Sequence, residues 1–329
     1  MSASPPAATS GTDTIASGPF NRPFRFGVQA SGAPDRRAWR DLARQAEDLG
    51  YDVLSVADHL DDQFATTPAI MAAADATTSI RLGAMVFCND YHHPVVLAKE
   101  AATLDVLSDG RLELGLGAGW MTTDYESAGI RMDPPAQRVT RLAEAVQVIK
   151  GLLAEGPVQF AGEHYQIRGL DGTPKPVQRP HPPIVIGGGG RRILSLAARE
   201  ADTIGLNIDL RHGRIDATSG PTATAEATER KLGWIRDAAG DRFFTLELQT
   251  RIHLAAVTDD RWALAELVGP ALGLTPSQAL ESPHGLAGTV DEIVEQCLDR
   301  RARWGISYIT VSAEAMVEMA PVVERLRGR

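Results

Sequence analysis

Two adjacent residues, Asp58 and His59, follow a short apolar stretch and have the side-chain types that proton transfer needs. A histidine titrates near neutral pH, and a neighbouring carboxylate can fix its tautomer. The structural alternative is an aspartate that caps a helix beside a packed or exposed histidine. The spacing alone leaves both interpretations open.

A run of four glycines, Gly187 to Gly190, lies between an apolar stretch and a predicted helix, and Arg191 and Arg192 follow it. Free backbone N–H groups at a helix N-terminus bind phosphate, and glycine lets the phosphate approach the backbone. A flexible turn is the alternative for a glycine run. The residues alone leave both interpretations, a phosphate site and a flexible turn, open.

A third pattern ends another predicted strand, where Gly115, Gly117 and Gly119 alternate before Trp120. Glycine at a strand end lets a flat ligand lie against bare backbone, although a crowded strand end has the same composition. An indole at this place can stack on a ligand or form the wall of an apolar pocket.

Strands and helices alternate along the chain, which is typical of a parallel sheet with helical crossovers. We expect strands at 24–29, 52–57, 80–87, 111–117, 184–186, 203–206, 243–257 and 306–312. We expect helices near 34–49, 68–77, 94–107, 137–154, 192–200, 222–239, 286–305 and 313–326, and a hairpin-bearing loop at 155–182. This pattern predicts an α/β fold, the (β/α)8 TIM barrel, with loop insertions. The alternative is a doubly wound sheet, whose Gly-x-Gly-x-x-Gly motif should follow the first strand, and the glycines at 115–119 have neither that spacing nor that place.

The predicted seventh strand carries polar residues at alternate positions, namely Glu247, Gln249, Arg251 and His253. Alternate residues of a strand share one face, so these side chains would point into the barrel together. Buried polar groups must pair with each other or meet a ligand. Both possibilities, a buried ion-pair network and a ligand-binding face, remain open.

The composition limits the partners that we expect. The chain has 329 residues with a net charge of −9, which argues against nucleic acid and anionic membranes. Residues 1–22 are rich in small and polar residues and are expected to form a disordered tail, followed by a single domain at 23–329. No apolar run approaches the roughly 20 residues of a membrane span. Cys88 and Cys297 show no metal spacing and suit a reducing cytoplasm, and we expect no metal site.

Three segments, Asp58-His59, residues 108–126 and residues 183–205, resemble the bacterial luciferase-like family, and in particular its branch that depends on the deazaflavin coenzyme F420. The resemblance covers roughly residues 24–325. It implies a barrel that binds F420 or FMN at the C-terminal ends of its strands, and commonly a homodimer.

The resemblance also implies roles for individual residues. His59, with Asp58, is implied in the proton transfer that accompanies hydride transfer, and a cis peptide bond near Met85 and Val86 is implied to support the central ring of the cofactor. The implied cofactor-binding residues are Met85, Val86, Gly119, Trp120, Gly187, Gly188, Gly189 and Gly190. In the sugar-phosphate dehydrogenase branch a glutamate stands where this chain has Trp120, so sugar-phosphate oxidation is not implied.

The leading hypothesis is an oxidoreductase that transfers a hydride between F420 and a small organic substrate. The alternative is a two-component monooxygenase that uses FMNH2 and O2 and needs a flavin reductase as partner. Two other classes fit less well. A metal-dependent hydrolase would need His-x-His on the first strand, which Phe26–Gln29 lacks. A barrel that only stores flavin would not need Asp58-His59.

Overall fold

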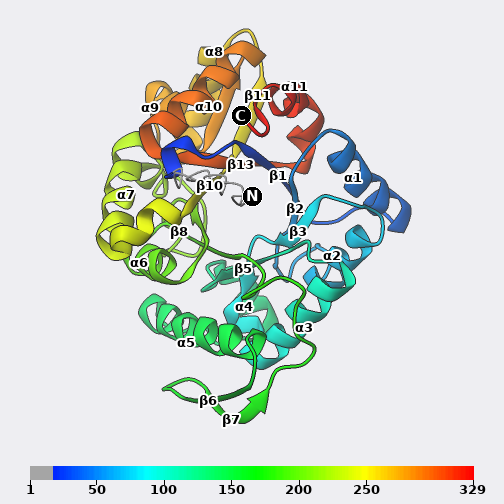
Figure 1. Ribbon diagram of the computed structural model, residues 1–329. Helices are drawn as coiled ribbons and strands as arrows, with labels where there is room; N and C mark the ends of the chain where they lie inside the picture. Colours follow the sequence, from blue (N-terminus) through cyan, green and yellow to red (C-terminus); the bar gives the residue numbers. More distant parts are fainter. Residues whose placement is uncertain (1–17) are drawn as a thin grey trace, which may run out of the picture.

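The computed structural model describes residues 18–329, which form a closed barrel of parallel strands surrounded by helices (Figure 1). The barrel strands are β1 (Arg25–Ala30), β2 (Val53–Val56), β3 (Arg81–Ala84), β4 (Phe87–Cys88), β5 (Leu112–Gly117), β8 (Ile184–Gly188), β9 (Thr203–Leu206), β10 (Glu247–Arg251) and β13 (Ile306–Ser312). They follow one another around the barrel in chain order, and β3 and β4 together occupy one strand position. β13 pairs with β1 and closes the barrel. The predicted (β/α)8 barrel is therefore confirmed.

The helices cover the outside of the barrel. They are α1 (Arg36–Asp48), α2 (Thr66–Ala74), α3 (Pro94–Leu107), α4 (Thr122–Ala128), α5 (Pro135–Leu153), α6 (Arg191–Glu200), α7 (Ala225–Ala239), α8 (Arg261–Val268), α9 (Pro276–Glu281), α10 (Val290–Trp304) and α11 (Met316–Leu326). Local capping sets several of their starts, since Asp35 caps α1 and Thr289 forms a capping box with Glu292 at α10. Within residues 18–329, no helix has the length and apolar character needed to cross a membrane.

The prediction of one long strand at 243–257 is wrong. Phe243–Thr245 belong to a 3-10 helix, η4 (Gly240–Thr245), and β10 ends at Arg251. After two residues the chain leaves the barrel as β11 (Leu254–Val257), which pairs with β12 (Gly285–Gly288) in a separate parallel sheet. The helix expected from residue 286 begins at Val290, because β12 occupies the preceding residues.

The insertions lie at the periphery. The hairpin expected at 155–182 is confirmed as β6 (Pro157–Ala161) and β7 (Gln166–Asp171), an antiparallel pair beyond α5 (Figure 1). The tail expected at 1–22 lies mostly outside the described residues. Its last part is structured, since η1 (Pro19–Asn21) is a 3-10 helix in which Pro19 is buried.

A layer of charged side chains fills the barrel at the N-terminal ends of the strands. Nη1 of Arg25 lies 2.7 Å from Oε2 of Glu247, and Nη2 of Arg25 contacts Glu113. Nε of Arg81 lies 2.7 Å from the same Glu113. Burial raises the pKa of Glu247, although Arg25 acts against the shift. Glu247, at the N-terminal end of the polar face of β10, is therefore paired within the protein.

Candidate active site

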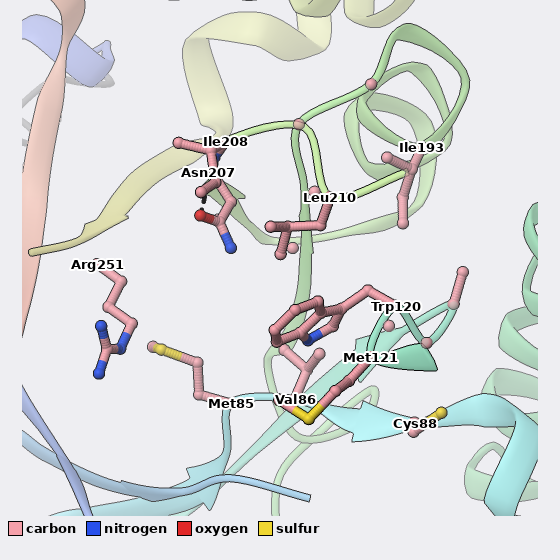
Figure 2. Close-up of a pocket in the computed structure, with 18 of the residues that line it drawn as sticks. Met85, Val86, Cys88, Trp120, Met121, Ile193, Asn207, Ile208, Leu210 and Arg251 are labelled. Carbon is pink, nitrogen blue, oxygen red and sulfur yellow. Dashed lines mark hydrogen bonds between the residues drawn. The ribbon is translucent and has the colours of Figure 1, made fainter. Parts of the chain in front are cut away.

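A cavity of about 770 Å³ lies at the C-terminal ends of the barrel strands, the usual place of a TIM-barrel active site. Residues from the predicted site segments line it, including His59, Val86, Trp120 and Gly187. Figure 2 shows Met85 and Val86 along one part of the cavity, with Trp120 and Arg251 on different sides of it. The fold therefore brings together side chains that lie far apart in the sequence.

His59 is held by Asp124, which is not the carboxylate that the sequence suggested. Nδ1 of His59 lies 2.7 Å from Oδ2 of Asp124, whose side chain is buried. A carboxylate only accepts hydrogen bonds, so the proton of the ring must be on Nδ1. Tyr91 donates to the same carboxylate at 3.2 Å, and the backbone N–H of Leu60 donates to it at 3.4 Å. The arrangement fixes the His59 ring and leaves its Nε2 for a ligand.

Asp58 lines the cavity but serves other partners. Its carboxylate accepts hydrogen bonds from Nε2 of His92 at 2.9 Å, from the backbone N–H of Cys88 at 2.8 Å and from the hydroxyl of Thr66 at 2.7 Å. Burial acts to raise the pKa of Asp58, but these hydrogen bonds outweigh it and the net shift is downward. The expectation that Asp58 orients His59 is wrong, and its contacts position β4 and the segment around His92.

The peptide bond between Met85 and Val86 is cis, as the resemblance implies. The glycines of β5 face this segment. A Cβ atom at Gly115 would overlap the carbonyl oxygen of Ala84, and one at Gly117 would overlap the side chain of Val86. These two glycines therefore make room for Ala84 and Val86 of the neighbouring strand segment.

The four glycines at the end of β8 and directly after it, Gly187 to Gly190, divide into two pairs. A Cβ atom at Gly188 would overlap the side chain of Ile193, and one at Gly189 would overlap the carbonyl oxygen of Ile208. At Gly187 it would have ordinary contacts, 3.9 Å from Val86, and at Gly190 its nearest neighbour would be 3.8 Å away. Gly188 and Gly189 thus serve packing, whereas Gly187 and Gly190 leave open space in the cavity.

Gly190 is also the N-cap residue of α6, and no side chain caps this helix end. The first N–H groups of α6 are therefore available to an anion, and the helix dipole favours negative charge there. Arg191 and Arg192 follow and both line the cavity. The geometry suits the phosphate site that the sequence predicts.

Trp120 lies at the edge of the cavity beside His59. The two rings meet edge to face with their centroids 5.6 Å apart. Gly119, just before it, has φ of 76°, and a Cβ atom there would overlap the hydroxyl of Tyr125. Met121 and Leu210 extend the apolar wall near Trp120 (Figure 2). This wall suits an apolar group next to the histidine.

Arg251, at the C-terminal end of β10, and His253, two residues after it, line the cavity. Nε of Arg251 donates to Oε1 of Gln29, and its Nη1 donates to Nδ1 of His253 at 3.0 Å. Burial and the neighbouring Arg251 lower the pKa of His253 to about 4, so its ring is neutral at pH 7. Nε2 of His253 then carries the proton and donates to Oδ1 of Asn207 at 3.3 Å.

Sequence reasoning missed some of these functions. Asp124 lies in a segment that the resemblance includes, but nothing in its spacing links it to a histidine 65 residues earlier. Arg251 was noted only as part of an alternating pattern with two explanations. Tyr91, Asn207 and His253 lie at the ends of predicted strands, and because strand ends meet at one rim, sequence reasoning places them near the site without showing their contacts.

A parallel barrel with a large polar and apolar cavity at this rim belongs to the class of TIM-barrel enzymes. A family model described as luciferase-like monooxygenase matches residues 20–235. The chain therefore belongs to the luciferase-like monooxygenase family, whose members are oxidoreductases.

The relatives include enzymes of both cofactor types. An F420-dependent glucose-6-phosphate dehydrogenase of Nakamurella multipartita is 29% identical over 303 residues, which cover 87% of this chain and 84% of the relative. An FMNH2-dependent dimethylsulfone monooxygenase of Pseudomonas putida is 27% identical over 187 residues, which cover 54% of this chain and 51% of the relative. The chain spans 45% of the length of a Mycobacterium tuberculosis protein that it matches with 37% identity over 132 residues, which are 40% of this chain.

Among solved structures, a coenzyme F420-dependent tetrahydromethanopterin reductase from Methanopyrus kandleri matches with a TM-score of 0.73. The match covers 93% of this chain and 100% of that chain, at 18% sequence identity. At this level of identity the likeness concerns the fold.

Proposed function

We propose that this protein transfers a hydride between coenzyme F420 and a small organic substrate, and that His59 moves the accompanying proton. The observation that carries the proposal is the His59–Asp124 pair in the wall of the cavity. Because Asp124 holds the proton on Nδ1, Nε2 of His59 can exchange a proton with the reacting group of a substrate.

The cavity has features that fit such a cofactor. Gly187 leaves a space beside Val86 that any larger side chain would fill, which suits a flat ring. The uncapped start of α6, with Gly190 and Arg192, suits the phosphate of the cofactor. When bound, F420 supplies or accepts the hydride. The protein contributes the position of the ring, an apolar wall around Trp120, and the proton at His59.

The relatives support both this proposal and one alternative. The Nakamurella multipartita relative is named for F420, and the Pseudomonas putida relative is named for FMNH2. If FMNH2 is the cofactor, the protein is a monooxygenase that needs a flavin reductase as partner. Trp120 stands where the sugar-phosphate dehydrogenase branch has a glutamate, so we do not extend the sugar-phosphate substrate to this chain.

We further propose a single domain at residues 23–329 that acts as a homodimer in the cytoplasm. The resemblance to luciferase-like barrels supports the dimer. Two buried free cysteines, Cys88 and Cys297, are in keeping with a reducing compartment. Sedimentation analysis of the purified protein measures the oligomeric state directly.

The deciding experiment is a titration of the apoprotein with F420 and with FMN, each oxidised and reduced, followed by fluorescence. Selective binding of F420 supports the proposal. Selective binding of reduced FMN overturns it in favour of the monooxygenase.

His59→Ala tests the role of the histidine. We expect turnover to fall by about 10²–10⁴-fold, while the affinity for the cofactor stays close to that of the wild type. Unchanged turnover would remove His59 from the mechanism.

A further inference from the structure

One part of the cavity wall presents hydrogen-bond donors that the protein does not use. We call Arg251, at the end of β10, and Asn207, directly after β9, the donor wall. The guanidinium of Arg251 has five N–H groups. In the part of the chain that the structure describes, one binds Gln29 and one binds His253, and the Nη2 group makes no hydrogen bond.

Asn207 is oriented by two donors on its oxygen. The backbone N–H of Ile208 donates to Oδ1 at 2.8 Å, and Nε2 of His253 donates to it at 3.3 Å. The NH2 group of Asn207 therefore points away from both, and Figure 2 shows it directed into the cavity. The donor wall thus offers the guanidinium and an amide NH2 to whatever lies in front of it.

The charge of Arg251 has no carboxylate partner among residues 18–329. The acidic group that acts on it, Glu314, is exposed beyond the end of β13 and forms no salt bridge with it. Burial lowers the pKa of Arg251, and the neighbouring His253 is neutral. A half-buried cation that meets only neutral groups is costly unless a ligand supplies an anion.

The arginines of the protein's other interior layer are different. Arg25 and Arg81, at the opposite ends of the strands, both pair with carboxylates. In that layer both arginines are paired with carboxylates, whereas Arg251, at the open end of the same barrel, has only neutral hydrogen-bond partners.

We propose that Arg251 and Asn207 bind a carboxylate of the substrate, so that the enzyme acts on small organic acids. The planar guanidinium matches a carboxylate with two parallel hydrogen bonds. The apolar wall of Trp120, Met121 and Leu210 takes the hydrocarbon part of the acid. That this acid is the substrate rests on the proposed function, but the binding of the carboxylate does not.

The test compares benzoate with benzamide, which has nearly the same shape and no charge. Binding of each probe to the apoprotein is measured by calorimetry for the wild type, Arg251→Gln and Arg251→Lys. Arg37→Gln is the matched control, since the Arg37 side chain is 91% exposed on α1. The affinity for F420 and FMN is measured for the same proteins, and circular dichroism verifies that each is folded.

We expect the wild type and Arg37→Gln to bind benzoate at least about tenfold more tightly than benzamide. Arg251→Gln should lose this preference, Arg251→Lys should keep part of it, and cofactor affinity should stay within about twofold. The proposal is overturned if the wild type does not distinguish the two probes, or if Arg251→Gln keeps the preference for benzoate. It is also overturned if Arg251→Gln loses cofactor affinity to the same extent as benzoate affinity. A wild type that prefers benzoate but binds neither cofactor would refute only the proposed function.

Discussion

Replacing Asp124 with asparagine tests whether the buried carboxylate sets the state of the His59 ring. In the structure both oxygens of Asp124 are used: Oδ1 accepts from the backbone of Leu60, and Oδ2 accepts from His59 and Tyr91. Asparagine has one oxygen and one NH2 group of nearly the same shape. Whichever way the amide turns, it loses an acceptor, and with NH2 toward His59 the ring must change its tautomer.

The size of the effect follows from the hydrogen bond that is lost. A hydrogen bond to a charged group contributes about 1.5–3 kcal/mol, and 1.36 kcal/mol corresponds to a factor of ten in rate. The 2.7 Å bond between His59 and Asp124 is buried and charge-assisted, so Asp124→Asn should lower turnover by about 10- to 150-fold. Cofactor affinity should remain unchanged, because the hydrogen bonds of Asp124 go to His59, Tyr91 and the backbone of Leu60 and not to the glycines at 187–190.

Two assays check this reasoning. The first measures kcat and KM with a turnover substrate, beside the dissociation constant of the cofactor. The second needs no substrate: nitrogen-15 spectra of the histidine rings report which nitrogen of His59 carries the proton. Asp62→Asn is the matched control, because Asp62 is exposed three residues after His59. If Asp124→Asn keeps the Nδ1 proton and the full turnover, or if Asp62→Asn shows the same loss, the assigned role of Asp124 is wrong.

Three further predictions concern the cofactor site, the packing of the barrel strands and the pH dependence of stability. Gly187→Val should fold normally, because a Cβ atom has ordinary contacts there, but should lose cofactor binding in a fluorescence titration; normal affinity would remove Gly187 from the ring site. Gly115→Ala should lower stability by about 1–3 kcal/mol in urea unfolding, because its Cβ would overlap the carbonyl of Ala84; an unchanged midpoint would contradict this packing. Burial opposes the shift, but the backbone N–H groups of residues 78–80 lower the pKa of Glu47 to about 2. Because the pKa of Glu47 is lower in the folded protein, its ionised carboxylate stabilises the fold above the ordinary pKa of 4.5, and this stabilisation is lost as the pH falls toward 2. The melting temperature of Glu47→Gln should therefore lie below that of the wild type by a constant amount above about pH 5, and the difference should shrink toward pH 2.

The barrel could be predicted because its signal is local and repeated. Each strand is a short apolar run, several helices have their own capping residues, and the alternation of eight such units defines the fold. The exception lies after Arg251, where only Ile252 and His253 separate β10 from β11. Both are compatible with a strand, and the break is set by pairing with β12, about thirty residues later in the chain. No local pattern could show it.

The site was predictable at the level of segments but less so at the level of contacts. The resemblance located the cis peptide bond between Met85 and Val86 and the glycines at 187–190. It did not show that Gly188 and Gly189 face the protein, because that depends on how α6 and the residues after β9 pack around them. It also did not show that Asp58 and His59, adjacent in the chain, bond to different partners. Adjacent side chains at a strand end point in different directions, so adjacency in sequence is weak evidence for contact.

The polar face of β10 shows why periodicity identifies a face but not its function. Glu247, Gln249 and Arg251 alternate into the barrel as the sequence indicates, yet their depths differ. Glu247 lies at the closed end, where Arg25 and the hydroxyl of Thr203 satisfy it at 2.7 and 2.9 Å. Arg251 lies at the open end, where only neutral groups meet it. Because one strand passes from the sealed interior to the cavity, the buried ion-pair network explains its first half, and the proposed carboxylate site would explain its second half. Depth along the barrel axis, which the sequence does not encode locally, decides whether a buried charge stabilises the fold or is available to bind a substrate.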